Sequence, residues 1–149
     1  MIKAEQLLKS YGSGELEVIA LKRLDLEIVD GDFVAVIGPS GAGKSTLLYQ
    51  LSLLDDPTSG EVYLDGVKTS GLNQVEKTAL RLHKLGYVFQ DYALLPELSA
   101  IDNVALPMLM QGMARLEALK KAEKALIRIH LQDKVKSLPS QLSGGQQQR

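Results

Sequence analysis

The sequence predicts an α/β fold in which a β-rich first part is followed by a helical second part. Three observations support this expectation. Short runs of apolar and β-branched residues alternate with turns up to residue 90. The run VAVI at 34–37 is apolar without alternation, as in a strand buried on both faces of a mostly parallel sheet. After GYVFQ at 86–90 the apolar residues take a helical spacing.

Turns separate the expected strands of the first part. The β-type segments are IKAEQLL at 2–8, LKRLDLEIVDGDFVAVIG at 21–38 and GEVYLDGV at 60–67. The second segment is divided by a turn at Gly31 and Asp32. The third contains Asp65 and Gly66, a dipeptide typical of a two-residue hairpin turn.

Two helices are expected in the second part. Ser99 and Asp102, three residues apart, form a capping pair for a helix near 100–112. A second helix, over about 114–130, has apolar residues on one face and most of its lysines and glutamates elsewhere. The apolar positions are Leu116, Leu119, Ala122, Leu126 and Ile129. We interpret this stripe as a core-facing surface with solvated charges opposite.

Composition limits the possible functions. The 149 residues are 45% hydrophobic and 23% charged, which is ordinary for a globular chain of about one domain. The 17 basic and 18 acidic residues create no overall field that attracts nucleic acid or an anionic membrane. There is no cysteine for a disulfide or a thiolate metal site, and His83 and His130 share no motif. The apolar runs are shorter than the roughly 20 residues of a spanning helix. Because MIKAEQLL also lacks a signal-peptide profile, we expect a chain that does not itself cross a membrane.

The strongest functional motif is GPSGAGKST at 38–46, which matches G-x-x-x-x-G-K-[ST]. At average residue frequencies, a chance match would occur in about one such sequence in a few hundred. The context also fits, because an apolar run precedes the motif and STLLYQLSLL follows it with leucines at helical spacing.

These residue types suit a phosphate. Small residues let backbone N–H groups surround phosphate oxygens at a helix N-terminus, where the partial charge is positive. Lys44 supplies a charge to the β- and γ-phosphates, and the Ser45 hydroxyl is placed to ligate Mg²⁺. The motif alone leaves kinases, GTPases, helicases and transporters open, and the structural alternative is a Gly/Ser turn before a helix.

A second motif, LSGGQ at 142–146, narrows this choice. Its chance appearance is on the order of one chain in several thousand. With this motif the sequence resembles the nucleotide-binding subunits of ABC transporters, in which LSGGQ is the family signature at the N-terminus of a helix. The resemblance covers the whole chain in order. It implies a P-loop NTPase core of the ABC type, with a mixed sheet and an N-terminal antiparallel β region, plus an α-helical subdomain.

The resemblance also implies a domain organisation, cofactors and site residues. Residues 1–90 would be the ATP-binding core with the Walker A loop and the Q-loop, 91–141 the helical subdomain, and 142–149 the signature and the start of the next helix. The implied cofactors are ATP and Mg²⁺. The implied ATP-binding residues are Tyr11, Gly38, Ser40, Gly41, Ala42, Gly43, Lys44, Ser45, Thr46, Ser143, Gly144, Gly145 and Gln146. Lys44 and Gln90 would act in catalysis, and Ser45 and Gln90 would ligate Mg²⁺.

Several of these residues have a structural alternative. Tyr11, implied to stack on adenine, could be a packing or surface residue. Gln90 stands at the end of an expected strand and could simply be solvated. Ser143 could be only an N-cap followed by a glycine turn. For Ser143, the N-cap role and the phosphate-binding role are compatible, because a capped helix end exposes N–H donors and a positive partial charge.

The implied partners are a second ATP-binding subunit and integral membrane permease subunits, and no nucleic acid. In the family the signature closes on the ATP of a head-to-tail partner, and the subunit lies in the cytoplasm at the inner face of the plasma membrane. Complete members continue into an apolar strand that ends in an Asp-Glu pair, which residues 1–149 do not contain. We therefore expect a piece of a longer subunit, which by itself binds nucleotide weakly and hydrolyses it negligibly.

Three functional hypotheses stay open. LLDDPTSGEV at 53–62, the stretch 86–108 and LSGGQQQR at 142–149 resemble the branch of lipoprotein-releasing and macrolide-exporting ATPases. The leading hypothesis is accordingly an ATP-driven motor subunit, coupled to a membrane protein through the region around Gln90 and the helical insert. The second is an ATP-gated module of cell-division signalling. The third, a soluble chromosome or translation ATPase, is disfavoured because the roughly 50 residues between Gln90 and Leu142 leave no room for a long coiled coil and there is no basic excess.

Overall fold

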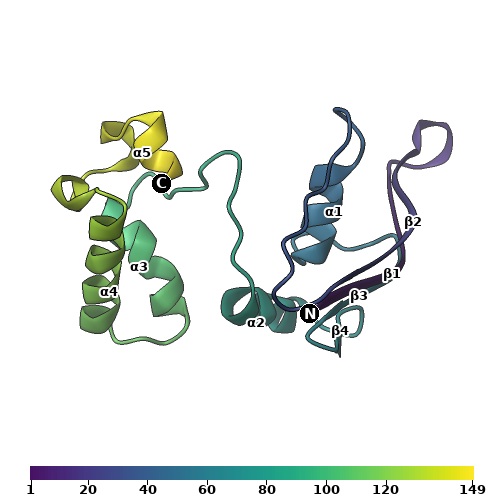
Figure 1. Ribbon diagram of the computed structural model, residues 1–149, viewed down its shortest axis with the longest axis horizontal. Helices are drawn as coiled ribbons and strands as arrows, with labels where there is room; N and C mark the ends of the chain where they lie inside the picture. Colours follow the sequence, from purple (N-terminus) through teal and green to yellow (C-terminus); the bar gives the residue numbers. More distant parts are fainter. The chain divides into compact units, whose positions relative to one another are not determined.

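The computed structural model describes all residues 1–149 and forms two compact units, Met1–Arg81 and Leu82–Arg149 (Figure 1). The first unit is built on a β-sheet and a covering helix and contains most of a second helix, and the second unit is built on helices. No helix of the chain is both long and apolar enough to span a membrane. The boundaries expected at residues 90 and 141 follow the functional motifs and stay predictions.

An antiparallel sheet of four strands forms the first unit, in the order β2-β1-β3-β4. The strands are β1 (Ile2–Tyr11), β2 (Val18–Ile28), β3 (Ser59–Leu64) and β4 (Val67–Lys68). The expected hairpin at 60–67 is confirmed. Asp65 and Gly66 have φ angles of 49° and 79°, which suit the two-residue turns that match the twist of a hairpin. The expected N-terminal antiparallel β region is therefore present.

The core of the first unit lies between this sheet and helix α1 (Lys44–Leu51), which contacts β1 and β2. Its buried apolar residues are Ala4, Leu7, Leu21, Leu47, Leu51, Leu53, Val62 and Leu64. Ala4 and Leu7 are three residues apart and would face opposite sides of a regular strand. A register shift between them, where Gln6 has a φ of 48°, turns both side chains into the core.

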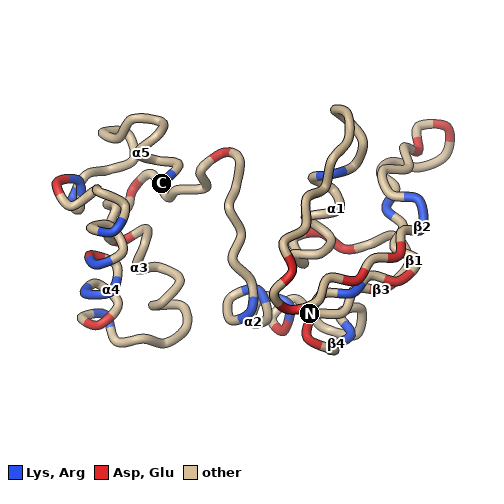
Figure 2. The backbone as a smooth tube through the Cα atoms, in the orientation of Figure 1, with Lys and Arg blue, Asp and Glu red and all other residues tan.

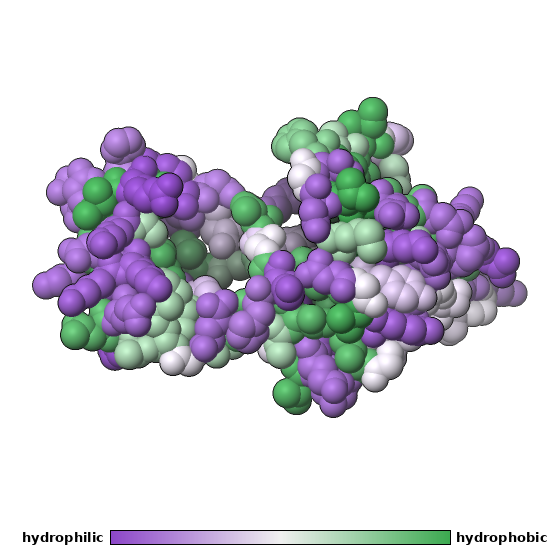
Figure 3. All heavy atoms as spheres, turned by 60° about the horizontal axis from the view of Figure 1, so that its bottom comes forward, coloured by the Kyte–Doolittle hydropathy of each residue, from purple (hydrophilic) through white to green (hydrophobic).

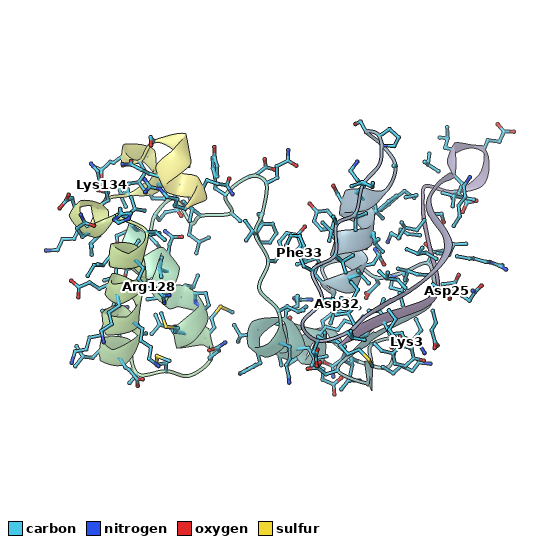
Figure 4. All side chains as sticks on the ribbon, in the orientation of Figure 1. Lys3, Asp25, Asp32, Phe33, Arg128 and Lys134 are labelled. Carbon is cyan, nitrogen blue, oxygen red and sulfur yellow. The ribbon has the colours of Figure 1, made fainter.

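The strand predicted at 34–37 is not formed in this structure. Residues 33–37 have no regular secondary structure, and Phe33 and Ile37 are 99% and 89% exposed. Figure 4 shows Phe33 projecting away from the sheet. A strand needs a neighbouring strand for its backbone hydrogen bonds, and none of the four strands pairs with this segment.

The second β-type run that forms no strand is GYVFQ at 86–90, so Gln90 does not end a strand as expected. Val88 in this run is 83% exposed. The chain has many exposed apolar residues, and Figure 3 shows green, apolar patches on the surface. The sequence pattern had favoured strands in both places because it records side-chain preference and not the presence of a pairing partner.

Helix α2 (Gln74–Lys84) was missed by the sequence analysis. A capping box marks its start: the Asn73 side-chain oxygen accepts hydrogen bonds from the N–H groups of Val75 and Glu76, and the Glu76 carboxylate accepts one from the Asn73 N–H. The sequence signal was Asn73 followed three residues later by Glu76.

The second unit confirms the two predicted helices as α3 (Ala100–Met110) and α4 (Arg115–Arg128), followed by the short helix α5 (Gly144–Gln148). Ser99 caps α3, since its hydroxyl oxygen accepts a hydrogen bond from the Asp102 N–H. Short 3₁₀ turns lie at Gln132–Lys134 and Pro139–Gln141.

The buried face of α4 differs in part from the predicted stripe. Ala122 and Leu126 are buried as expected, but Leu116 is 69% exposed and Ala118 is buried in its place. Ala118 and Ala122 pack against Ala105, because small side chains let α3 and α4 approach closely. The solvent side of α4 carries mixed charges (Figure 2), among them the ion pair of Lys121 with Glu117 at 3.0 Å.

Candidate nucleotide-binding site

The glycine-rich loop 38–46 leads directly into helix α1, as its sequence predicts. Gly43 is the N-cap residue and has a φ of 84°, in the left-handed region that glycine adopts at little cost. A Cβ at this position would lie 2.5 Å from the Ala20 carbonyl oxygen of β2, closer than atoms can approach. The glycine therefore permits both the turn into the helix and the close contact of the loop with the sheet.

Lys44 lies over this loop. Its ammonium group donates hydrogen bonds to the carbonyl oxygens of Gly38 at 3.0 Å and Pro39 at 2.8 Å. The first bond within α1 is from the Leu47 N–H to the Gly43 carbonyl at 2.8 Å, so the N–H groups before Leu47 have no partner in the helix repeat. The Lys44 ammonium and several backbone donors thus converge at a positive helix end, an arrangement suited to an anion.

A hollow of about 520 Å³ adjoins the loop within the first unit. It is lined by residues 19–22 of β2, by Val36 and Ile37, and by Gly41–Lys44. Its volume falls within the range of about 300–1,000 Å³ that is usual for small-molecule sites. The loop therefore has open space beside it for a ligand larger than a phosphate ion.

Tyr11, the expected adenine-stacking residue, ends β1 and is 44% exposed. It pairs with Val18 of β2, two residues before Ala20, which contacts the loop at Gly43. Tyr11 therefore lies near the point of β2 that contacts the loop, but it does not line the hollow beside the loop.

The Tyr11 hydroxyl donates a hydrogen bond to the Asp55 carboxylate at 3.1 Å, and the Lys9 ammonium lies 4.9 Å from the centre of the Tyr11 ring. Burial raises the pKa of the Asp55 carboxyl, but hydrogen bonds from Lys9 and Tyr11 outweigh that effect and hold the pKa below its usual 3.8. Asp55 is therefore ionised at neutral pH. No local sequence signal connects Asp55 with Tyr11, so this contact was not predicted.

Magnesium would depend on few protein ligands here. No group of three histidine or acidic side chains in the structure could hold a metal ion. Ser45, in the first turn of α1, is an exposed residue with a hydroxyl oxygen. Mg²⁺ that is bound with a nucleotide takes one or two protein oxygens and otherwise phosphate oxygens and water, so this single hydroxyl fits a nucleotide-bound ion.

The other expected site residues belong to the second unit. Gln90 lies in an exposed turn after the irregular segment 85–89. Ser143 is the N-cap of α5, and its hydroxyl oxygen accepts the Gln146 N–H at 3.3 Å while the Gln146 side chain accepts the Ser143 N–H at 2.9 Å. The N-cap interpretation of Ser143 is thus confirmed.

The two signature glycines have different surroundings. A Cβ on Gly144 would lie 3.1 Å from the Tyr92 hydroxyl, whereas a Cβ on Gly145 would meet no atom within 4 Å. Packing within the chain therefore gives a reason for glycine at 144 but not at 145. Tyr92 was not predicted as a site residue, because no sequence motif marks it. In the structure Tyr92 and Ala93 have positive φ angles of 60° and 54°.

Comparison with known proteins matches residues 21–149 to the ABC transporter family. An uncharacterised ABC transporter ATP-binding protein of Methanocaldococcus jannaschii is 46% identical over 149 residues, which are 100% of this chain and 66% of that protein. The lipoprotein-releasing system ATP-binding protein LolD of Nitrobacter winogradskyi is 44% identical over 141 residues, 95% of this chain and 61% of the relative. The macrolide export ATP-binding/permease protein MacB of Marinobacter nauticus is 44% identical over the whole chain, which covers 23% of its length.

Among solved structures, a dimer of the ATP-binding cassette MJ0796 in a post-hydrolysis state bound to ADP and Pi has a TM-score of 0.92 at 43% identity. That match covers 99% of this chain and 65% of the cassette. The chain thus spans about two thirds or less of the relatives it matches. The predicted fold class, an α/β ATPase core of the ABC type with an N-terminal antiparallel β region and a helical part, is confirmed. The mixed sheet predicted with it is not formed in this structure, because all neighbouring strands pair antiparallel. On the family match and these identities, the chain belongs to the ABC transporter family.

Proposed function

We propose that this chain is the ATP-binding part of a subunit that hydrolyses ATP to drive a membrane partner. The observation that carries the proposal is the convergence of the Lys44 ammonium and the α1 N-terminus on one loop, beside an open hollow. Gly38 and Ser40–Thr46 would surround the phosphates, Tyr11 would stack on adenine, and Ser45 would ligate Mg²⁺. Gln90 would contact the metal or the attacking water.

The signature would serve a second subunit. Ser143, Gly144, Gly145 and Gln146 would contact the ATP bound by the loop of a head-to-tail partner. In this chain no atom lies within 4 Å of a Cβ added at Gly145, so a phosphate of the partner's ATP would have room to approach there. The cassette MJ0796, which is similar to this chain, is dimeric with ADP and Pi bound.

Hydrolysis needs more than the loop. A carboxylate must secure Mg²⁺ and polarise the attacking water, and the resemblance places it in an Asp-Glu strand that residues 1–149 do not contain. We propose that residues 1–149 by themselves bind nucleotide weakly and hydrolyse it negligibly.

The membrane partner and cargo follow from the relatives. Because LolD and MacB are named for lipoprotein release and macrolide export, we propose integral permease subunits and a lipoprotein- or macrolide-like cargo. The subunit would then work in the cytoplasm, at the inner face of the membrane that holds the permease.

The test of ATP binding compares ATP with adenosine, which has the base and sugar of ATP but no phosphates. Calorimetric titration of the chain with ATP and with adenosine, each with Mg²⁺, should show ATP binding at least about tenfold more tightly, because charge-assisted hydrogen bonds to phosphate dominate the affinity. Equal affinity for adenosine and ATP would exclude a phosphate-binding loop as the site. Repeating the ATP titration with EDTA should weaken binding, since the Ser45 hydroxyl would have no metal to hold.

A further inference from the structure

Three side chains converge on the carboxylate of Asp55, which follows the end of α1. The Lys9 ammonium donates to Oδ1 at 2.8 Å, the Tyr11 hydroxyl to Oδ2 at 3.1 Å, and the Gln50 amide to Oδ2 at 3.0 Å. The Asp55 N–H donates to the Tyr49 carbonyl at 3.3 Å, so the backbone is held as well. One carboxylate therefore joins the end of β1 to the last turn of α1.

Gln50, a buried residue, restrains the orientation of the Asp55 carboxylate from the side of the core. Gln50 is fully buried, and its side-chain oxygen has no hydrogen-bond partner, which is costly. Its NH₂ group points at Asp55. The Gln50 oxygen stays unpaired while the Gln50 nitrogen donates to Asp55 Oδ2. This hydrogen bond from a buried side chain fixes the position of that carboxylate oxygen.

Lys9 fixes the ring from a second direction. Its ammonium donates to Asp55 and to the Asp56 carbonyl oxygen at 2.7 Å, and it lies 4.9 Å from the centre of the Tyr11 ring. The cation thus covers one face of the ring, while Asp55 holds the hydroxyl at the tip. With both held, the rotation of the ring is restricted, although 44% of Tyr11 stays exposed.

We propose that Asp55 is a positioning residue for the adenine platform: with Lys9 it fixes the plane of the Tyr11 ring, so that the uncovered face is ready to stack on the base. The proposal rests on the proposed function, in which Tyr11 stacks on adenine. A ring that is already ordered loses less conformational freedom when the base binds. The expected contribution to ATP affinity is about 2- to 10-fold.

The test separates positioning from a purely structural role by using two probes, ATP and inorganic tripolyphosphate, which has no base. Asp55→Asn should weaken ATP binding about 2- to 10-fold and leave tripolyphosphate binding unchanged. Tyr11→Phe keeps the ring but removes the hydroxyl, so it should weaken ATP by a similar factor without loss of fold. If Asp55 and the Tyr11 hydroxyl act through their one contact, the two effects should not add. The double variant should then bind ATP no more weakly than whichever single variant has the lower affinity.

Asp56→Asn is the matched control. The Asp56 carboxylate is on the neighbouring residue and pairs with Lys77, not with Tyr11. This variant should bind both probes as the wild type does. If Asp55→Asn weakened ATP and tripolyphosphate equally, the carboxylate would support the fold and the proposal would be overturned. Unchanged ATP affinity in both Asp55→Asn and Tyr11→Phe would also overturn it.

Tyr11→Ala distinguishes failure of this inference from failure of the underlying function. If Tyr11→Ala weakens the binding of ATP but not of tripolyphosphate, Tyr11 is the platform for the base. If Asp55→Asn then leaves ATP binding unchanged, only the positioning role of Asp55 is overturned. If Tyr11→Ala leaves ATP binding unchanged, adenine does not stack on Tyr11. In that case the proposed platform fails together with the role of Asp55.

Discussion

Replacing Lys44 with alanine is expected to weaken ATP binding about 10- to 100-fold, because hydrogen bonds to charged groups contribute about 1.5–3 kcal/mol. In the structure the ammonium donates to the carbonyl oxygens of Gly38 and Pro39, so it already lies over the loop that would hold the phosphates. No other lysine or arginine lines the hollow beside the loop except Lys22. Calorimetric titration of both proteins with Mg-ATP measures the loss.

Lys124→Ala is the matched control for charge. Lys124 is exposed on α4 in the second unit, far along the chain from the loop, and its removal changes the net charge by the same amount. It should bind ATP as the wild type does. If Lys44→Ala bound ATP with wild-type affinity, or if Lys124→Ala lost as much, the loop would not be the phosphate site.

Replacing Gly145 with leucine is expected to weaken ATP-dependent dimerisation at least about tenfold, or about 1.4 kcal/mol. In this chain a side chain at Gly145 meets open space. Leucine also has a higher helix propensity than glycine, so the variant should fold at least as well as the wild type. The side chain would instead stand between the signature and the phosphate of the partner's ATP. Sedimentation velocity with Mg-ATP, over a range of protein concentrations, measures the dimer.

Gly71→Leu tests whether any added leucine has this effect. Gly71 is exposed, also faces open space and lies in the first unit, outside every expected site. This variant should dimerise with ATP as the wild type does. Dimers of Gly145→Leu that persisted at wild-type affinity would argue against a signature that contacts the partner's nucleotide.

Most features with their own local signals were predicted from the sequence, whereas α2 was missed although Asn73 and Glu76 mark its start. The helices α3 and α4 have a capping serine or an apolar period, and the β3–β4 turn has Asp65 and Gly66. The loop before α1 was equally clear, since the spacing of Gly38, Gly43 and Lys44 has one strong physical meaning.

Features that depend on distant neighbours were not predictable. The apolar run at 34–37 has strand-like residues but no pairing strand, and it is irregular. Leu116 fits an amphipathic stripe, yet it is exposed, and Ala118 packs in the core with Ala105 of α3. The contact of Tyr11 with Asp55 spans 44 positions of sequence and follows from the path of β1 beside the end of α1.

The central claim, that the loop 38–46 binds the phosphates of ATP, is tested most directly by chemical protection of Lys44. The chain is treated with an amine-reactive reagent with and without Mg-ATP, and the labelling of each lysine is measured by mass spectrometry. ATP should strongly slow the labelling of Lys44, because phosphate oxygens would surround its ammonium group, and should leave the labelling of Lys124 unchanged. Labelling of Lys44 that is unaffected at ATP concentrations that saturate binding would contradict the account.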